Sequence, residues 1–259
     1  MTIPYYLIGT KLNIESLKNI LRILLVDVCL LKPWIPNPHY YFSSCGVMWF
    51  VSTIFFCYCC YPMLKNVEKM SSRKIILLVV AIYICQIGIK AGTYILGASW
   101  EISDWICYIF PITKSSDFII GIMLGALYRR GCFEGKAYKI LFWMGLIFYA
   151  ITNYIKNNNF FKIQDFFGNY FCTIPIIVML IGATGINMSN KYIKNIVTDM
   201  ADRTMIIFIF HQTIICYVKR FLKISSRSWE LFIILFVCIL YSELICRIDY
   251  YIKGKKKNE

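Results

Sequence analysis

The sequence is poor in charged residues, and the charges that it has are mostly of one sign. Only 16% of its 259 residues are charged, with 14 acidic residues against 28 lysines and arginines. Soluble domains carry about 25% charged residues, so the low share argues against a water-soluble fold. The net charge of +14 does not indicate a DNA-binding domain either. Such a domain gathers its cations on one face, whereas these cations lie in short clusters between long apolar runs.

Several enzyme motifs are missing as well. The sequence contains no glycine-rich phosphate-binding loop, no HExxH and no GxSxG, which excludes the enzyme classes that these motifs identify. Its 12 cysteines lack the paired spacing of a metal site, so we expect no metal. Cys57 and Cys60 form a CxxC, but they lie in an apolar run. Packing as small hydrophobic side chains is therefore favoured over redox chemistry.

What the sequence has is apolar residues in long runs. Hydrophobic residues make up 59% of it and the mean hydropathy is +0.61, more than a soluble domain of this size buries in one core. A helix needs about 20 mostly apolar residues to cross a bilayer. The sequence therefore predicts an all-α integral membrane protein, a polytopic bundle of about seven transmembrane helices. The predicted spans are 47–64, 75–96, 106–128, 140–155, 170–186, 204–221 and 230–252.

Short polar connections between these runs predict a single membrane domain over residues 1–259. Residues 1–46 are expected to form an amphipathic helix and an outer loop, residues 47–252 the transmembrane bundle, and residues 253–259 a basic cytoplasmic tail. An interfacial helix is favoured over a span in the first part because charges interrupt its apolar spacing. The apolar residues at helical spacing are Leu17, Leu21, Leu24, Val28 and Leu31.

The orientation follows from the distribution of cations, because cytoplasmic loops carry an excess of lysine and arginine. The first, third and fifth connections and the tail carry clusters of cations, whereas the alternate connections carry few. Five of the six tryptophans map to the opposite boundary, where indole rings prefer the headgroup layer. The sequence therefore predicts a protein of the cell (inner) membrane with a cytoplasmic carboxyl terminus. The clustered cations include Lys65, Lys69, Arg73, Lys74, Arg129, Arg130, Lys136 and Lys139.

Polar side chains at membrane depth are costly, so each needs a partner or a purpose. His211 lies in an apolar run, about 10 Å from the predicted cytoplasmic start of its span. Its imidazole could move a proton or hold a substrate hydroxyl. The alternative is an interhelical hydrogen bond shared with Gln212.

Lys114 and Asp117 are three residues apart, so a helix places them on one face, where an ion pair is expected. Gly121 and Gly125 follow at a spacing that permits close helix approach. Lys90 lies in the outer third of its span, where its ammonium either reaches the headgroups or faces a polar cavity.

Three stretches resemble the acyltransferase-3 family of membrane O-acyltransferases, which modify sugars of polysaccharides and related glycans. The family's outer loop and first shared span resemble Lys32–Pro36 and Gly46–Ser52, which include Trp49 and Ser52. A family pattern of proline, basic residue, acid and phenylalanine resembles Pro111–Gly121, with Lys114 for the usual arginine and Asp117 for the usual glutamate. The penultimate family helix with its histidine resembles Phe208–Gln212.

The resemblance extends over residues 4 to about 252 and implies a reaction. It implies transfer of an acyl group, in the first instance acetyl, from acyl-CoA to a sugar hydroxyl of a cell-surface glycan, with no bound cofactor. It also implies membrane lipid as a partner and no nucleic acid. His211 is then the candidate catalytic residue. The candidate substrate-pocket residues are Trp49, Ser52, Lys114, Asp117 and Gln212.

One departure from the family pattern limits that expectation. The family has ten helices, and its catalytic histidine and accompanying arginine precede the part that this chain resembles. The resemblance therefore implies that the chain corresponds to the last seven helices, and that alone it lacks the base. We expect it to be inactive without an amino-terminal segment or a partner chain. The alternative function is a glycan or lipid-linked precursor transporter or flippase, with ionisable groups on the path. These groups are Lys90, Lys114, Asp117 and His211.

Overall fold

The computed structural model describes residues 14–42, 46–133, 135, 137–158, 167–186, 190–222 and 227–256. Every regular element within these ranges is helical, which confirms the predicted all-α fold. The chain divides into two compact units. We call residues 28–41 and 49–187 the central unit, and residues 1–27, 42–48 and 188–259 the terminal unit.

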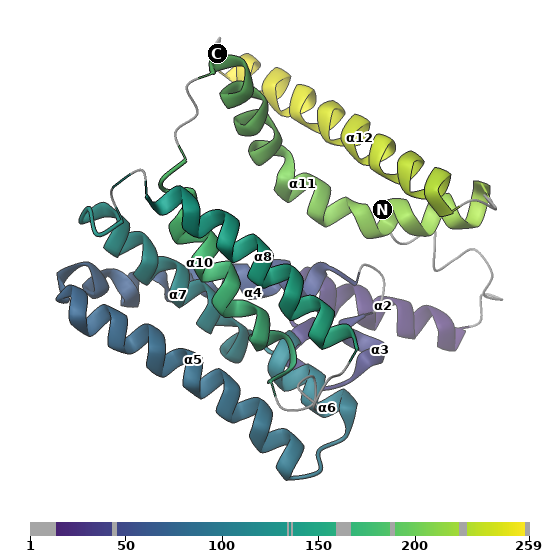
Figure 1. The fold of residues 1–259 in the computed structure, drawn as a ribbon. Coiled ribbons are helices and arrows are strands. Elements are labelled where there is room, and N and C mark those ends of the chain that lie inside the picture. The colour runs from purple at the N-terminus through teal and green to yellow at the C-terminus, as the bar shows by residue number, and fades with distance from the viewer. Residues whose placement is uncertain are drawn as a thin grey trace. The chain divides into compact units, whose positions relative to one another are not determined.

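The central unit consists of long helices joined by short helical turns (Figure 1). Pro111 opens α7 at a position where its missing amide hydrogen has no helical partner to lose. Gly97 follows α5 with a φ of 64°, a left-handed conformation that glycine adopts without strain and that ends a helix. The elements are η1 Lys32–Trp34, α3 Pro38–Tyr41, α4 Met48–Leu64, η2 Lys65–Lys69, α5 Ser72–Ile95, α6 Trp100–Asp104, the π-helical η3 Trp105–Ile109, α7 Pro111–Arg129, α8 Tyr138–Asn157, η5 Gly168–Cys172 and α10 Thr173–Ala183.

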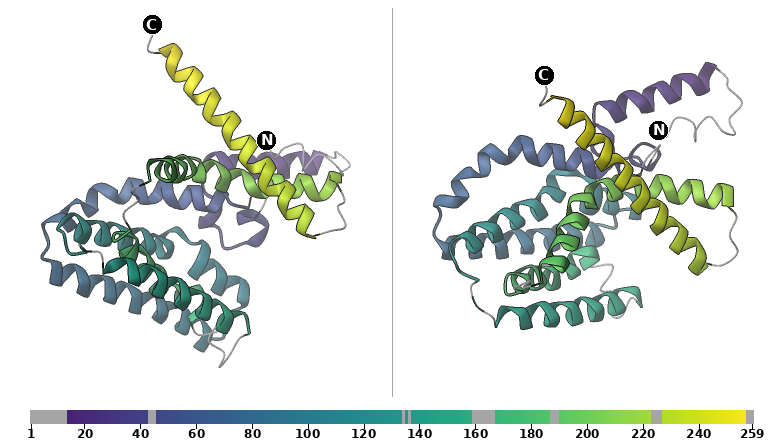
Figure 2. Two further views of the ribbon diagram at one scale, coloured as in Figure 1. Left: turned by 45° about the horizontal axis from the view of Figure 1, so that its top comes forward. Right: turned by 90° about the horizontal axis from the view of Figure 1, so that it is seen from above.

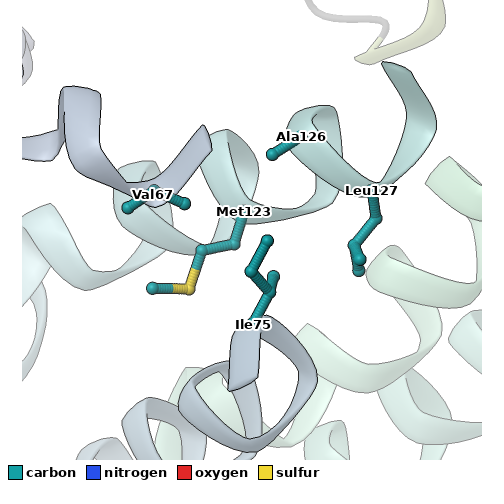
Figure 3. Close-up of a cluster of buried hydrophobic side chains, with 5 residues drawn as sticks. All are labelled: Val67, Ile75, Met123, Ala126 and Leu127. Atoms are coloured by element: carbon teal, nitrogen blue, oxygen red, sulfur yellow. The ribbon is translucent and has the colours of Figure 1, made fainter. Parts of the chain in front are cut away.

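A small apolar core holds one end of α5 and of α7 together. Ile75, at the start of α5, is fully buried and points toward Met123 and Leu127 of α7 (Figure 3). Val67 of η2 and Ala126 of α7 complete the cluster. A second buried cluster joins Tyr41, Trp49 and Ile109. The first cluster fixes the carboxyl-terminal end of α7, and the second packs α3 and α4 against η3, which leads into α7.

Glycines allow α8 and α10 to approach each other closely. A Cβ atom added at Gly182 would lie 2.1 Å from the backbone nitrogen of Phe142. One at Gly145 would lie 2.8 Å from the backbone nitrogen of Met179. Small residues at such contacts let helix backbones pack tightly in a membrane, where van der Waals contact drives association.

The terminal unit contains α2 Ile14–Val28, α11 Lys191–Leu222 and α12 Arg227–Lys256. The helix predicted before the first span is confirmed as α2, and its interfacial position stays a prediction. Figure 2 shows α12 as one long continuous helix. Arg203 of α11 binds Asp199 at 2.7 Å and Glu243 of α12 at 2.5 Å, which ties the two helices together.

Six helices of the described residues are long and apolar enough to cross a membrane, so the exact count of seven is not confirmed. The predicted fifth span, 170–186, is the short apolar helix Asn169–Ala183. Its 3-10 and α-helical parts together rise roughly 26 Å, slightly less than the hydrocarbon thickness of about 30 Å. The six are Met48–Lys69, Ser72–Ile95, Trp100–Arg129, Tyr138–Asn157, Lys191–Leu222 and Ser228–Asp249.

Reporter fusions test the predicted orientation. We expect a reporter after Glu259 to be cytoplasmic and one inserted after Ala98, between α5 and α6, to be external, because the cation clusters flank the opposite helix ends. Paired alkaline phosphatase and green fluorescent protein fusions read the two sides independently. An external carboxyl terminus would contradict the orientation.

Candidate functional site

A cavity of about 510 Å³ lies within the central unit, between α7, α8, η5 and α10. Its walls are apolar over much of their area, with Ile120, Leu124 and Leu180 among the lining residues. Ligand pockets of roughly 300–1,000 Å³ have this mixture of apolar walls and a few placed polar groups. The polar side chains that line it include Lys114, Asp117, Tyr149, Asn153, Lys156 and Asn169.

Asp117 is held from two sides. The Nε2 of Gln86 on α5 donates to its Oδ1 at 2.7 Å, and the Nζ of Lys114 lies 2.7 Å from its Oδ2. The Gln86 side chain is 2% exposed, whereas that of Asp117 is 40% exposed. A carboxylate has about four acceptor positions, so two remain for a molecule in the cavity. The predicted Lys114–Asp117 ion pair is confirmed.

The ammonium of Lys114 also lies over an aromatic ring. Its Nζ is 5.4 Å from the ring centroid of Tyr108, a cation–π distance. The Tyr108 ring in turn packs on Trp49, with centroids 4.9 Å apart. Trp49 is buried, 7% exposed, and supports the cavity wall from behind. Trp49 lies behind Tyr108 and not among the lining residues, and its predicted part in a substrate pocket stays a prediction.

The opposite wall is tied down by hydrogen bonds. Lys156 of α8 donates to the Oδ1 of Asn169 at 2.7 Å, and the hydroxyl of Tyr170 donates to the carbonyl of Cys107 at 2.6 Å. The hydroxyl of Tyr83 on α5 donates to the carbonyl of Tyr170 at 3.4 Å. These bonds connect η5 to α5, η3 and α8, so the polar groups of this wall are positioned before any ligand arrives.

Ser52 is placed elsewhere. It is buried on α4, and its hydroxyl donates to the backbone carbonyl of Leu30. This bond ties α4 to the turn after α2, where Leu30 has a φ of 56°. A positive φ is uncommon for leucine and needs support from its surroundings, which the Ser52 bond supplies. The predicted role of Ser52 in a substrate pocket stays a prediction.

His211 and Gln212 lie on α11 in the terminal unit. The Nδ1 of His211 is 2.6 Å from the carbonyl oxygen of Phe208. Because a carbonyl only accepts, this contact is a hydrogen bond in which Nδ1 is the donor. Gln212 packs against Gly46, where an added Cβ would lie 2.7 Å from its Nε2. The catalytic role of His211 stays a prediction.

The Lys90 ammonium has a polar partner inside the central unit. Its Nζ donates to the hydroxyl of Ser103 at 2.7 Å, and that hydroxyl lies 2.9 Å from the hydroxyl of Thr93. Ser103 and Thr93 are both buried. Whether the ammonium reaches the headgroups or faces a polar cavity stays a prediction.

Sequence reasoning missed several groups around Asp117. Gln86 has the clearest signal in retrospect, because an amide in the middle of an apolar span needs a partner at membrane depth. Asn153 carries the same signal. Tyr108 and Tyr170 carry no such signal, because nothing in the sequence distinguishes them from the other tyrosines among the 19 in the chain.

A double-mutant comparison tests the charge pair. We expect Asp117→Ala to lower stability by about 1–3 kcal/mol, because Lys114 loses its counter-charge at membrane depth. The double variant with Lys114→Ala should be more stable than Asp117→Ala, since it leaves no lone charge. Thermal inactivation in detergent, followed by size-exclusion chromatography, measures all three. Damage that simply adds in the double variant would contradict the pairing.

The chain was also compared with known proteins. A family model described as an acyltransferase domain, that of the acyltransferase-3 family, matches residues 2–247. No curated protein and no solved structure matches the chain.

Proposed function

This chain belongs to the acyltransferase-3 family, and from that premise we propose that it transfers an acetyl group from acetyl-CoA to a sugar hydroxyl of a cell-surface glycan. The observation that carries the acceptor side is the cavity of about 510 Å³ around Asp117. The proposal places the protein in the cell membrane with its carboxyl terminus in the cytoplasm.

The polar groups of the cavity suit a sugar. A sugar presents hydroxyls that each donate one hydrogen bond and accept others, so a site for it needs both kinds of partner. Asp117 supplies acceptors, Lys114 supplies donors, and Asn153 and Asn169 supply both. Tyr108 and Tyr149 add ring surface for the apolar face of the sugar. Lys114 and Asp117 neutralise each other, and Lys156 donates to Asn169, so each charged group of the cavity has a partner before a sugar binds.

The reaction itself is an exchange of one acyl bond for another. The acceptor hydroxyl loses its proton to a base as its oxygen bonds to the carbonyl carbon of the thioester. The carbon–sulfur bond breaks, and coenzyme A leaves as the thiol after it takes up a proton. In this proposal the free acceptor positions of Asp117 orient the attacking hydroxyl, and a base of suitable pKa removes its proton.

A neutral His211 that donates its Nδ1 proton to the Phe208 carbonyl would have Nε2 as its accepting nitrogen, as a general base requires. By resemblance alone, His211 stays the candidate catalytic residue of this chain, and the family's own base would come from an amino-terminal segment or a partner chain. His211→Ala, compared with His211→Gln, separates proton transfer from packing. Loss of transfer in both variants at normal protein levels supports the role.

The test of the function uses cells in which the gene is native, so that anything that works with the chain is present. Membranes from these cells and from a deletion strain receive acetyl-CoA labelled in the acetyl group. We expect labelled glycan only where the chain is present. Glycan that moves across the membrane unlabelled would instead favour the transporter, for which the ionisable cavity groups Lys114 and Asp117 would be path residues.

A further inference from the structure

A second cavity, smaller at about 290 Å³ and more open than the first, lies alongside α7. Tyr61 of α4 contributes one side of it. The rest comes from α7, with Phe118, Gly121, Ile122, Gly125 and Arg129. We call this cavity the glycine groove. Its residues on α7 run from Phe118 to Arg129, roughly 16 Å along the helix at about 1.5 Å per residue.

The glycine groove and the Asp117 cavity share one residue. Successive residues of an α-helix are turned by about 100°, so residues 114, 117, 121 and 124 fall on one face of α7 and residues 118, 122, 125 and 129 on the adjacent face. Gly121 lies on the edge between the two faces and lines both cavities. A Cβ added there would have no atom within 4 Å, so the space beside Gly121 is open.

The far end of the glycine groove is strongly basic. Residues 65–74 and 129–130, which meet there through η2, the start of α5 and the end of α7, contain six cations and one acid. The acid is Glu68, which binds Arg129 at 2.5 Å. Its backbone carbonyl accepts from Arg130 at 2.7 Å. The Nη1 of Arg129 lies 3.8 Å from the position of a Cβ on Gly125, so the guanidinium extends back over the groove.

We propose that the glycine groove holds the phosphopantetheine arm of the acyl-CoA donor. The phosphates lie on the cations at the Arg129 end, and the arm passes under the Arg129 guanidinium at Gly125 into the open space beside Gly121. The thioester then reaches the Asp117 cavity past Gly121. This inference rests on the proposed function, because it takes acyl-CoA as the donor.

Charge and shape both favour this occupant. A chain that carries several phosphates at one end matches six clustered cations, and arginine binds phosphate in a fork geometry. The arm itself is slender and mostly apolar, with amides that need few partners, of which the Tyr61 hydroxyl is one candidate. Glycines along the path leave the room that such a chain requires.

A measurement of coenzyme A binding tests the inference and does not depend on acyl transfer. The purified full chain in zwitterionic nanodiscs is titrated calorimetrically with coenzyme A, and with adenosine 3′,5′-bisphosphate, which has phosphates but no arm. We expect coenzyme A to bind more tightly. Gly121→Leu should weaken coenzyme A by about tenfold or more and leave the bisphosphate unchanged, because the side chain fills the path of the arm. Arg129→Gln should weaken both ligands.

Gly88→Leu is the matched control. Gly88 is also a glycine on an exposed face of a long helix with no atom within 4 Å of an added Cβ, but it lies on α5 outside both cavities. It should leave both affinities unchanged. Gly121→Ala adds a smaller side chain and should weaken coenzyme A binding by less than Gly121→Leu. It provides the measurement if the leucine variant does not fold.

The outcomes separate this inference from the proposed function. Coenzyme A binding that Gly121→Leu does not alter, or equal binding of both ligands, overturns the groove and leaves acyl transfer standing. Displacement of coenzyme A by anionic phospholipid in the nanodisc also overturns it, because the groove is then a lipid site. No coenzyme A binding by the unmodified chain also overturns the groove, whereas labelling of glycan in the native cells decides acyl transfer separately.

Discussion

Asp117→Asn is expected to lower glycan acetylation by about 100-fold or more at matched protein levels. Asparagine keeps the shape of the side chain but places an amide NH₂ or a neutral oxygen where Lys114 and a substrate hydroxyl meet a full negative charge. Hydrogen bonds to a charged acceptor are about twice as strong as neutral ones. Groups that orient or deprotonate an attacking hydroxyl typically contribute 10²–10⁴-fold. Acetyl transfer to glycan in native cells measures the effect.

The matched control is Asp199→Asn. Asp199 also pairs with a cation on its own helix, Arg203 at 2.7 Å, but it lies on α11 in the terminal unit and lines neither cavity. Removal of a comparable helical ion pair should change stability by only a few tenths of a kcal/mol and leave transfer intact. Asp117→Glu, which keeps the charge, should retain part of the activity. Full activity of Asp117→Asn would show that the carboxylate has no part in the reaction.

Gly182→Ala is expected to prevent normal packing of α8 on α10. Its Cβ would lie 2.1 Å and 2.5 Å from the backbone nitrogen and Cα of Phe142. Side chains can turn away from such a contact, but a helix backbone can only move as a whole. We expect a loss of about 3 kcal/mol, at the upper end of ordinary overpacking, and poor recovery in detergent. Thermal unfolding measured by size-exclusion chromatography gives the value.

Gly92→Ala serves as the comparison for Gly182→Ala. It makes the same substitution in a long helix, α5, where an added Cβ meets no atom within 4 Å. Alanine has the higher helix propensity, so this variant should be as stable as the original chain or slightly more stable. Equal stability of the two variants would mean that α8 and α10 separate at little cost, contrary to the close packing described above.

The sequence predicted local features well. The Lys114–Asp117 pair was predictable because residues three apart on one helix are neighbours whatever the rest of the fold does. The long spans were predictable because an apolar run in a bilayer must be helical. The partners of Asp117 across the fold were not. Gln86 is 31 residues away along the chain, and only the packing of α5 on α7 brings it within 2.7 Å.

Helix ends were predicted less well than helix centres. The predicted span 204–221 lies inside α11, which begins 13 residues earlier, at Lys191. The charged first turns of α11 contain no apolar run, but Asn190 caps them by accepting from the Tyr192 amide at 2.9 Å. Arg203 and Asp199 add an ion pair one turn apart. Hydropathy detects the part of a helix that lies in lipid, whereas caps and ion pairs set where the helix starts.

The π-helical segment η3 fixes the chain length between α6 and α7. The backbone amide of Phe110, just after η3, donates to the carbonyl of Trp105 at 2.8 Å. This bond reaches five residues back, whereas an α-helical bond reaches four, so the π-helical turn contains one extra residue. Removal of one residue here would turn α6 by about 100° about its axis. The Trp105 indole, which donates to the Pro33 carbonyl at 2.9 Å, and Ser103, which binds Lys90, would both lose their partners. Homologues should therefore tolerate substitutions in η3 more readily than a change of its length. Alignments of the family should show varied residue types in this segment and almost no insertions or deletions.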